Sequence, residues 1–237
     1  MDFDVMQPIL LLTRPERQAK RFQADCAEAF GFRPQTLIAP MMVIQPRLQF
    51  VLPPADETLL VTSENALDAL FQRVDLTGRR AICVGQVTTK SAQGYGLAAE
   101  FGGPSAKALI DFIQQSDEPG PFGHVHGTYT TGDIVEELRD AGRKANGYVV
   151  YDQVAIPLSD GARTILGLNR QVILPLFSPR SARLFFDGNP PLNPGLDVVA
   201  ISPAVAQVVP SQVSTTVAAE PTAVAMVQAV GSLIKQA

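Results

Sequence analysis

Small polar residues follow the ends of several apolar runs, at points where a strand would give way to a helix. These residues are Thr13, Thr62, Ser63, Gly85, His126, Ser178 and Ser202. Serine and threonine are common there because a side-chain oxygen caps the free N–H groups of the first helical turn. The same N–H groups and the helix dipole also bind anions. The residues therefore indicate either plain helix capping or a neutral surface that binds a polyanion.

The two histidines of the chain, His124 and His126, stand two apart and would share one face of a strand. A zinc site needs three or four ligands, and no cysteine or acidic residue accompanies the pair at a suitable spacing. We therefore expect no metal site, and interpret His126 as a donor lining a cleft or as a loop residue. A Ser-His-Asp hydrolase is disfavoured, since the chain has no Gly-x-Ser-x-Gly turn and no third histidine. Glu136 and Glu137 are interpreted as a solvated helix face.

One segment matches a loose dinucleotide-binding pattern, Gly94-Tyr95-Gly96-Leu97-Ala98-Ala99. It follows a predicted helix, whereas the phosphates of a dinucleotide lie at a helix N-terminus that follows a strand. The chain has no P-loop and no pair of cysteines at zinc spacing. We therefore expect no bound nucleotide.

Short apolar runs alternate with helical patterns along the whole chain. The predicted strands are Ile9–Leu12, Gln35–Ile38, Leu59–Thr62, Ala81–Val84, Gly123–His126, Tyr148–Val154, Val172–Phe177 and Val198–Ile201. The predicted helices begin near Pro15, Glu64, Thr88, Ser105, Thr131, Pro179, Pro203 and Glu220. Gly31 and Gly142 follow helices as left-handed C-caps would. This alternation predicts an α/β protein with parallel sheets flanked by helices.

Two stretches of the chain are similar to each other. Leu60–Ala66 and Leu176–Ala182 both read as an apolar strand end, a hydroxyl residue and a helix start. We infer two related three-layer α/β domains, the first built from residues 1–39 and 157–237 and the second from residues 46–147. The chain would cross between them at residues 40–45 and 148–156, as a two-strand ladder that acts as a hinge beside a cleft. Ligands of open α/β sheets bind beyond the carboxyl ends of the strands, so the polar residues above would converge there.

Composition excludes other classes of protein. The chain of 237 residues is 46% hydrophobic with a net charge of −4, which argues against global disorder. Its 19 Lys and Arg residues are outnumbered by 23 Asp and Glu residues, and they form no basic run. We therefore expect no nucleic-acid partner. Cys26 and Cys83 fit buried thiols in a reducing compartment. With no signal peptide and no apolar stretch long enough to span a bilayer, we expect a cytoplasmic monomer that binds no membrane.

At this point five motifs, in order and spacing along nearly the whole chain, resemble the uroporphyrinogen-III synthase family. They are Leu10–Pro15, Val61–Ala66, Val84–Thr88, Val150–Gln153 and Phe177–Ala182. The resemblance implies two flavodoxin-like domains joined by a two-strand ladder, the architecture reached above from the residues alone. It also implies a lyase that closes the linear tetrapyrrole hydroxymethylbilane with inversion of ring D, without metal or cofactor. Hydroxymethylbilane synthase, which supplies the substrate, would be a transient partner.

The resemblance also suggests roles for individual residues. Tyr151 aligns with the family's tyrosine and would be the polar group nearest the leaving hydroxyl; the alternative is that it only packs in the ladder. The groups that would bind the acetate and propionate arms of the substrate are Arg14, Thr62, Ser63, Thr88, His126, Gly127 and Ser178.

Some positions depart from the family pattern. Where the family often reads Gly-Pro-Thr-Thr-Ala, this chain has Ser202–Ala206, with Val205 in place of a hydroxyl residue. His126-Gly127 replaces a frequent Arg-Gly, and residues 208–216 are poor in helix formers. These departures leave open a non-catalytic or regulatory module that binds a tetrapyrrole or another polyanion in its cleft. A periplasmic solute binder is disfavoured because no signal peptide is recognised.

Overall fold

The computed structural model describes residues 7–130 and 132–235. By internal contacts the chain divides into two units, Met1–Val43 with Ala155–Ala237, and Ile44–Val154. The chain leaves the first unit within β3 (Met42–Pro46) and returns to it within β8 (Ala145–Ala155), and these two strands are hydrogen-bonded neighbours. The N–H of Ile156 donates to the carbonyl of Met41, and that of Arg47 to the carbonyl of Val150, so the two segments run antiparallel. Whether the units also fold and move as separate domains stays a prediction.

The first unit is built on a five-stranded sheet in the order β11-β10-β9-β1-β2. Its strands are β1 (Ile9–Leu12), β2 (Thr36–Ile38), β9 (Val172–Leu176), β10 (Leu196–Ala200) and β11 (Ser214–Val217). All neighbouring pairs are parallel. Numbered along the chain within the unit, the order is 2-1-3-4-5, that of flavodoxin.

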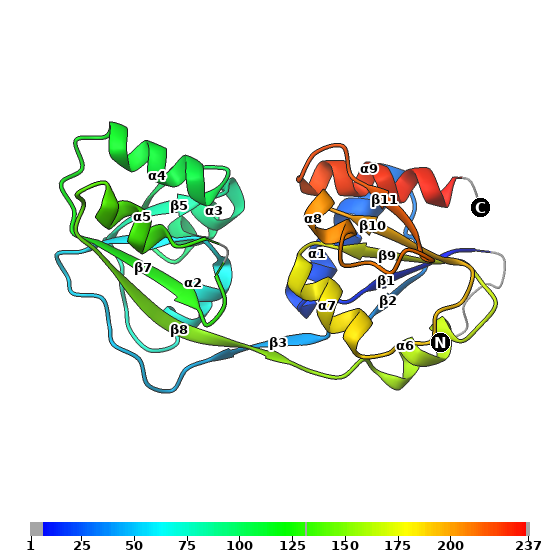
Figure 1. The fold of residues 1–237 in the computed structure, drawn as a ribbon. Helices are drawn as coiled ribbons and strands as arrows, with labels where there is room; N and C mark the ends of the chain where they lie inside the picture. The colour runs from blue at the N-terminus through cyan, green and yellow to red at the C-terminus, as the bar shows by residue number, and fades with distance from the viewer. Residues whose placement is uncertain (1–6, 131, 236–237) are drawn as a thin grey trace. The chain divides into compact units, whose positions relative to one another are not determined.

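Helices cover both faces of this sheet (Figure 1). On one face, α1 (Glu16–Phe30) and α9 (Ala223–Ile234) bury Phe22 and Met226 against alternate strand residues such as Leu10. On the other face lie α6 (Asp160–Leu166), α7 (Pro179–Asp187) and α8 (Pro203–Ala206). The strands are buried on both sides, which is why they read as continuous apolar runs.

The second unit has a six-stranded sheet in the order β3-β8-β7-β4-β5-β6. The strands not yet given are β4 (Thr58–Val61), β5 (Arg80–Val84), β6 (Ala98–Gly103) and β7 (Phe122–Gly127). Helices α2 (Glu64–Phe71) and α3 (Gln86–Gly94) pack on one face, and α4 (Ala106–Gln115) and α5 (Ile134–Asp140) on the other. The parallel strands β4 to β8 follow the order 3-2-1-4-5, which matches five of the six strands in the dinucleotide-binding order 3-2-1-4-5-6.

The expected α/β class with parallel sheets is confirmed, and each of the eight predicted strands is present within a few residues of its predicted ends. The strand order of the second unit differs from the flavodoxin order that was expected for both units. Here α2 and α3, on one face, connect β4 to β5 and β5 to β6 toward one edge of the sheet. α4, on the other face, then connects β6 to β7 on the opposite side of β4. The prediction missed β6, β11 and α6. β6 (Ala-Ala-Glu-Phe-Gly-Gly) and β11 are largely exposed strands at sheet edges, where little apolar patterning is required.

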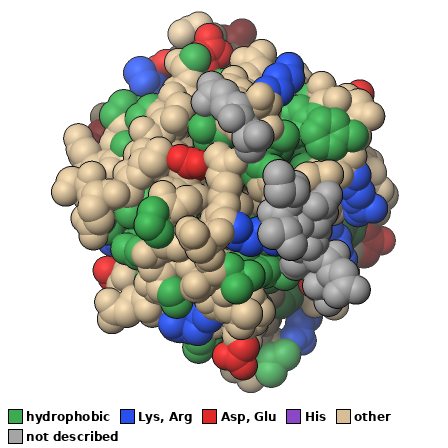
Figure 2. Space-filling model, turned by 90° about the vertical axis from the view of Figure 1, so that its right-hand side faces the viewer, with side chains coloured by type: hydrophobic (Ala, Val, Ile, Leu, Met, Phe, Trp, Pro, Cys, Tyr) green, Lys and Arg blue, Asp and Glu red, His purple; other side chains and the backbone are tan. Residues whose placement is uncertain are grey.

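Charged side chains of both signs are visible on one face of the molecule. On the face shown in Figure 2, acidic and basic groups of the described residues stand among neutral and hydrophobic ones, without an extended basic patch. Within the described part of the chain, no helix is long and apolar enough to cross a membrane.

Candidate active site

Each sheet has one point where the strand order reverses, between β1 and β9 in the first unit and between β4 and β7 in the second. Ligands of such sheets bind beyond the carboxyl ends of the strands at this point. Thr62 and Ser63 follow β4, while His126 and Gly127 end β7. Arg14 and Ser178 stand at the corresponding edge of the first unit, after β1 and β9.

Tyr151 lies at the same edge of the second unit, on β8 beside the end of β7. Its side chain is buried, and burial raises the pKa of the phenol above its ordinary value. Hydrogen bonds from the side chains of Ser63 and Asn65 and from the backbone of Gly127 favour the phenolate and act against this shift. The phenol is therefore protonated at neutral pH and lies among polar groups rather than in a purely apolar core.

Gly127 permits this placement of Tyr151. A Cβ atom at Gly127 would lie 2.4 Å from Cε2 of the Tyr151 ring, closer than real Cβ contacts allow. The β7–β8 ladder also shifts register here, with His126 opposite Val149 but Gly127 opposite Tyr151. This bulge lets the consecutive residues Val150 and Tyr151 both pack in the core on the α2 side.

Thr62 and His124 are paired across β4 and β7. The Thr62 hydroxyl oxygen lies 3.3 Å from Nε2 of His124. The register sets Leu60 opposite His124, so Thr62, two residues further on, shares its face of the sheet. Burial, followed by the neighbouring His126, lowers the pKa of His124 to about 3, so its imidazole is neutral at physiological pH.

The two imidazole rings stack, with 4.7 Å between their centroids. Nδ1 of His126 lies 2.8 Å from the carbonyl oxygen of Gly127, and because a carbonyl only accepts, the proton of this bond lies on Nδ1. This bond joins the His126 ring to the end of β7, and a role for His126 as a donor lining a cleft stays a prediction.

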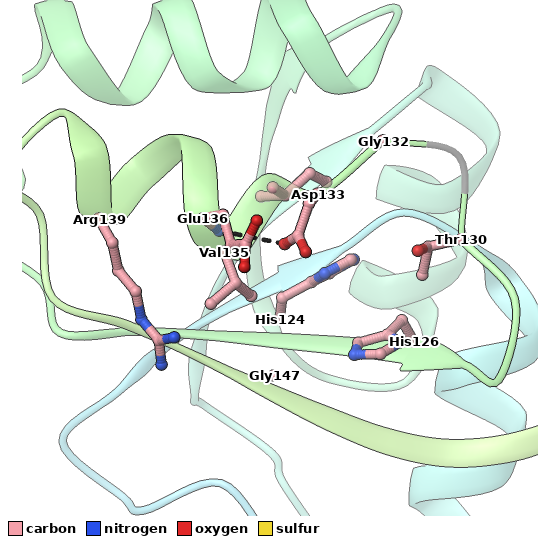
Figure 3. Close-up of a pocket in the computed structure, with 10 residues that line it drawn as sticks. His124, His126, Thr130, Gly132, Asp133, Val135, Glu136, Arg139 and Gly147 are labelled. Carbon is pink, nitrogen blue, oxygen red and sulfur yellow. Dashed lines mark hydrogen bonds between the residues drawn. The ribbon is translucent and has the colours of Figure 1, made fainter.

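A pocket of about 230 Å³ opens beside the two histidines, on the α5 side of the sheet. Figure 3 shows the rings of His124 and His126 in its wall with Asp133 nearby, and Arg139 at the far end from Thr130. Glu136 also lines it, although the sequence indicated only a solvated helix face; its backbone N–H donates to the Asp133 carboxylate, the N-cap of α5. Asp133 and Arg139 were not foreseen, since no local pattern links residues from a loop and a helix to a neighbouring strand.

The predicted hydroxyl residues divide into caps and others. Ser63 accepts from the N–H of Asn65 at 3.2 Å as N-cap of α2, and Ser178 accepts from the N–H of Ser181 at 3.0 Å as N-cap of α7. Plain capping is therefore part of what both do. Thr62 lies before the cap, and Thr88 is buried in the first turn of α3. Ser63 and Ser178 are both N-cap residues, so they occupy corresponding positions in the two units. The similarity inferred from the sequence matched Thr62 with Ser178 and was therefore offset by one residue.

In the first unit, the guanidinium of Arg14 lies over the ring of Phe177, 3.8 Å from its centroid. Burial lowers the pKa of Arg14 to about 10, with Arg21 acting in the same direction, and the group stays charged at neutral pH. The neighbouring Thr13 hydroxyl oxygen is buried and has no hydrogen-bond partner among the described residues. The Arg14 cation therefore lies at this edge beside the neutral hydroxyl of Thr13.

Val205 is the buried residue of α8 and packs in the core of the first unit. Ser202 is the N-cap residue of that short helix, but its side chain makes no capping hydrogen bond to the described residues. Where a hydroxyl was expected from the resemblance, the chain therefore has a packing residue.

Side chains that could bind a metal are dispersed in the described part of the fold. Within residues 7–130 and 132–235, no three His, Cys, Asp or Glu side chains are grouped to hold a metal ion. Cys26 and Cys83 are free and buried, and burial raises the pKa of both thiols to about 12. Their thiols are therefore unreactive at neutral pH.

Comparison with known proteins gives a family and a fold. The family model described as uroporphyrinogen-III synthase HemD matches residues 21–228. The fold is similar to that of uroporphyrinogen-III synthetase from Helicobacter pylori, with a TM-score of 0.68 and 16% identity over 96% of this chain and 100% of that one. It is also similar to a mutant uroporphyrinogen III synthase from Thermus thermophilus, with a TM-score of 0.51 and 14% identity over 97% and 100% of the two chains. No curated protein sequence matches significantly.

Proposed function

The chain belongs to the uroporphyrinogen-III synthase family, and we propose that it catalyses this family's reaction, the closure of hydroxymethylbilane to uroporphyrinogen III. The reaction is that of a lyase, since one water leaves as the ring closes. Loss of the terminal hydroxyl gives an azafulvene, which the substituted carbon of ring D attacks to form a spiro intermediate. That intermediate fragments and recloses with ring D inverted.

The competing reaction defines what the protein must do. Without an enzyme, the azafulvene closes readily to the symmetric type I isomer. Catalysis therefore consists mainly of holding one geometry, with modest acid assistance to the leaving hydroxyl. We assign no step to a metal or a cofactor.

Tyr151 is the proposed donor to the leaving hydroxyl. The observation that carries this role is its buried phenol, held protonated at the carboxyl edge of the sheet among Ser63, Asn65 and Gly127. A phenol donates a hydrogen bond to the departing oxygen without bringing a charge into the site. Packing alone, the alternative role, requires no polar partners around the hydroxyl.

Neutral groups are proposed to bind the carboxylate arms. In the second unit these are Thr62, Ser63 and Thr88, with the backbone N–H groups near Gly127; in the first unit Ser178 is joined by the cation Arg14. The side chain of His126, which lines the pocket, is proposed to contact an arm as well. Thr62 is supported by its contact with the neutral His124, which anchors its hydroxyl. Closure of the two units over the substrate, through a hinge at β3 and β8, is part of this proposal.

The decisive experiment is a coupled assay with porphobilinogen and hydroxymethylbilane synthase, followed by oxidation and separation of the uroporphyrin isomers. Type III product that depends on this protein would establish the activity. Type I product alone, from a folded sample, would overturn it and favour a non-catalytic module that binds a tetrapyrrole or another polyanion. The buried Val205, in place of a hydroxyl, is the observation that favours this second candidate.

We further propose that the protein acts as a cytoplasmic monomer and receives its unstable substrate from hydroxymethylbilane synthase in a transient encounter. Two free, buried cysteines suit a reducing compartment. Light scattering during size-exclusion chromatography tests the monomer, alone and with the synthase.

A further inference from the structure

The segment that follows β7, residues 127–129, lies against the end of β8 and is held there by side chains. The N–H of Thr128 donates to the carbonyl of Tyr151 at 3.1 Å, which continues the ladder for one residue. Beyond that point, no backbone pair joins the two strands within the described residues. Side chains from the two residues after Tyr151 make the remaining contacts.

Gln153 takes the place of the next backbone pair. Its Oε1 accepts from the N–H of Tyr129 at 2.9 Å, and its Nε2 donates to the carbonyl of the same residue at 3.2 Å. A primary amide presents its carbonyl oxygen as an acceptor and one of its N–H groups as a donor on the same side, so Gln153 satisfies both backbone groups of Tyr129. The same Oε1 would lie 2.9 Å from a Cβ at Gly127, so the amide lies close to the glycine as well.

Asp152 also binds the segment, through Thr128. Its carboxylate accepts from the Thr128 hydroxyl and pairs with Arg47, whose Nε lies 3.1 Å from both carboxylate oxygens. These hydrogen bonds lower the pKa of Asp152, with Arg47 the larger influence, so the group is ionised at neutral pH. Arg47 follows β3, so the crossing strands and the 127–129 segment meet at one carboxylate.

The position of the 127–129 segment affects Tyr151 directly. The backbone of Gly127 hydrogen-bonds the Tyr151 hydroxyl, and the ring lies so close to Gly127 that a methyl group there would collide with it. A shift of Tyr129 away from Gln153 would therefore move Gly127, and with it a hydrogen bond and a packing surface of Tyr151.

We propose that Gln153 is a positioning residue for Tyr151, which holds the 127–129 segment so that the phenol keeps its direction. This inference rests on the proposed synthase activity and adds a residue to it. Gln153 touches no reacting atom in this role; it acts through Tyr129 and Gly127.

The test compares three variants of the full chain. Gln153→Ala removes both hydrogen bonds to Tyr129, and Gln153→Glu keeps the acceptor for the N–H but cannot donate to the carbonyl. Gln114→Ala, on the exposed face of α4, is the matched control for loss of a glutamine side chain. Each is assayed for kcat, KM and isomer ratio. The chain has four tyrosines, so its Cζ carbons, labelled with ¹³C and assigned by Tyr→Phe variants, report on Tyr151 without any assay.

For Gln153→Ala we expect kcat for the type III isomer to fall about three- to tenfold with KM nearly unchanged, because small misplacements of a reacting group are costly. The type I fraction should rise, the Cζ signal of Tyr151 should move, and the unfolding temperature should stay close to that of the wild type. For Gln153→Glu, kcat and the type I fraction should lie between those of Gln153→Ala and the wild type. Gln114→Ala should match the wild type in both.

Two results would overturn the inference: an unmoved Tyr151 signal in Gln153→Ala, or a moved signal with unchanged kcat and isomer ratio. A wild-type protein that forms no type III isomer would instead overturn the proposed function, and with it any part of Gln153 in the reaction. The Tyr151 signal then shows separately whether Gln153 holds the segment.

Discussion

The hydroxyl oxygen of Thr62 lies 3.3 Å from Nε2 of His124, across the two strands at which the sheet order of the second unit reverses. The imidazole is 4% exposed and neutral at physiological pH. A threonine of the proposed substrate surface is thus anchored by an uncharged group, which brings no fixed charge to an edge that we propose binds several carboxylates.

Because His124 is neutral in the folded chain, we expect the free energy of unfolding to decrease as the pH falls below 6.5. Its pKa is about 3 in the folded chain and ordinarily 6.5, so below pH 6.5 the unfolded chain binds the additional proton. Its share of the unfolding free energy is complete above pH 6.5 and is lost as the pH falls toward 3. Since one pKa unit corresponds to about 1.4 kcal/mol, the loss is on the order of a few kcal/mol. Urea unfolding at several pH values measures it.

The control for this prediction is His124→Gln, which keeps a polar group near Thr62 but does not titrate. Its unfolding free energy should vary less between pH 6.5 and 4 than that of the wild type. An identical pH dependence in both proteins would show that groups other than His124 account for the effect.

Replacement of Tyr151 by phenylalanine should slow formation of the type III isomer at least several-fold while the protein stays folded. The ring and its contact with Gly127 remain, and only the proposed donor is lost. Isomer analysis after the coupled assay measures the rate, and thermal unfolding checks the fold. Tyr95→Phe is the matched control, since the Tyr95 hydroxyl bonds Asp68 on an exposed part of α2.

A fully active Tyr151→Phe protein would remove the phenol from the mechanism. In the wild type, burial raises the Tyr151 pKa above its ordinary value of 10, so the group remains a donor from pH 7 to 9. No loss of rate in that range should follow from its titration.

Joint replacement of Thr62, Thr88 and Ser178 by alanine should raise KM for hydroxymethylbilane, because three neutral donors to the carboxylate arms disappear. Loss of the Ser178 cap should also cost about 1 kcal/mol of stability. The single variant Ser105→Ala, which removes the similar cap of α4, controls for that cost. An unchanged KM in the triple variant would leave these residues with structural roles alone.

Val205→Thr restores the hydroxyl expected from the family pattern, but we expect it to destabilise the protein and to leave KM unchanged. Val205 is fully buried among apolar side chains, and burying a hydroxyl there costs about 1–3 kcal/mol. Urea unfolding measures this, with Ala204→Thr at the exposed neighbouring position as the comparison. A lower KM in Val205→Thr would show that the position reaches the substrate.

Much of the fold could be predicted from the residues alone. Runs such as Ile9–Leu12 and Val172–Leu176 are apolar at every position because parallel strands are buried on both faces, and such runs can be recognised locally. The helix starts at Ser63 and Ser178 depend on hydrogen bonds within three residues, so they too are visible in the sequence. Edge strands such as β11 satisfy neither condition and were missed.

The order of residues along the chain thus determined the α/β class, most strands, the caps and, by resemblance, the family. Only the tertiary structure decided the strand order of the second unit, the pairing of Thr62 with His124, and the contact of Gln153 with Tyr129. The two contacts join residues that are 62 and 24 positions apart in the sequence. They also depend on which face of the sheet each side chain takes, which the strand register decides. Local propensity carries no information at that distance, because side-chain contacts across strands exist only once the sheet has formed.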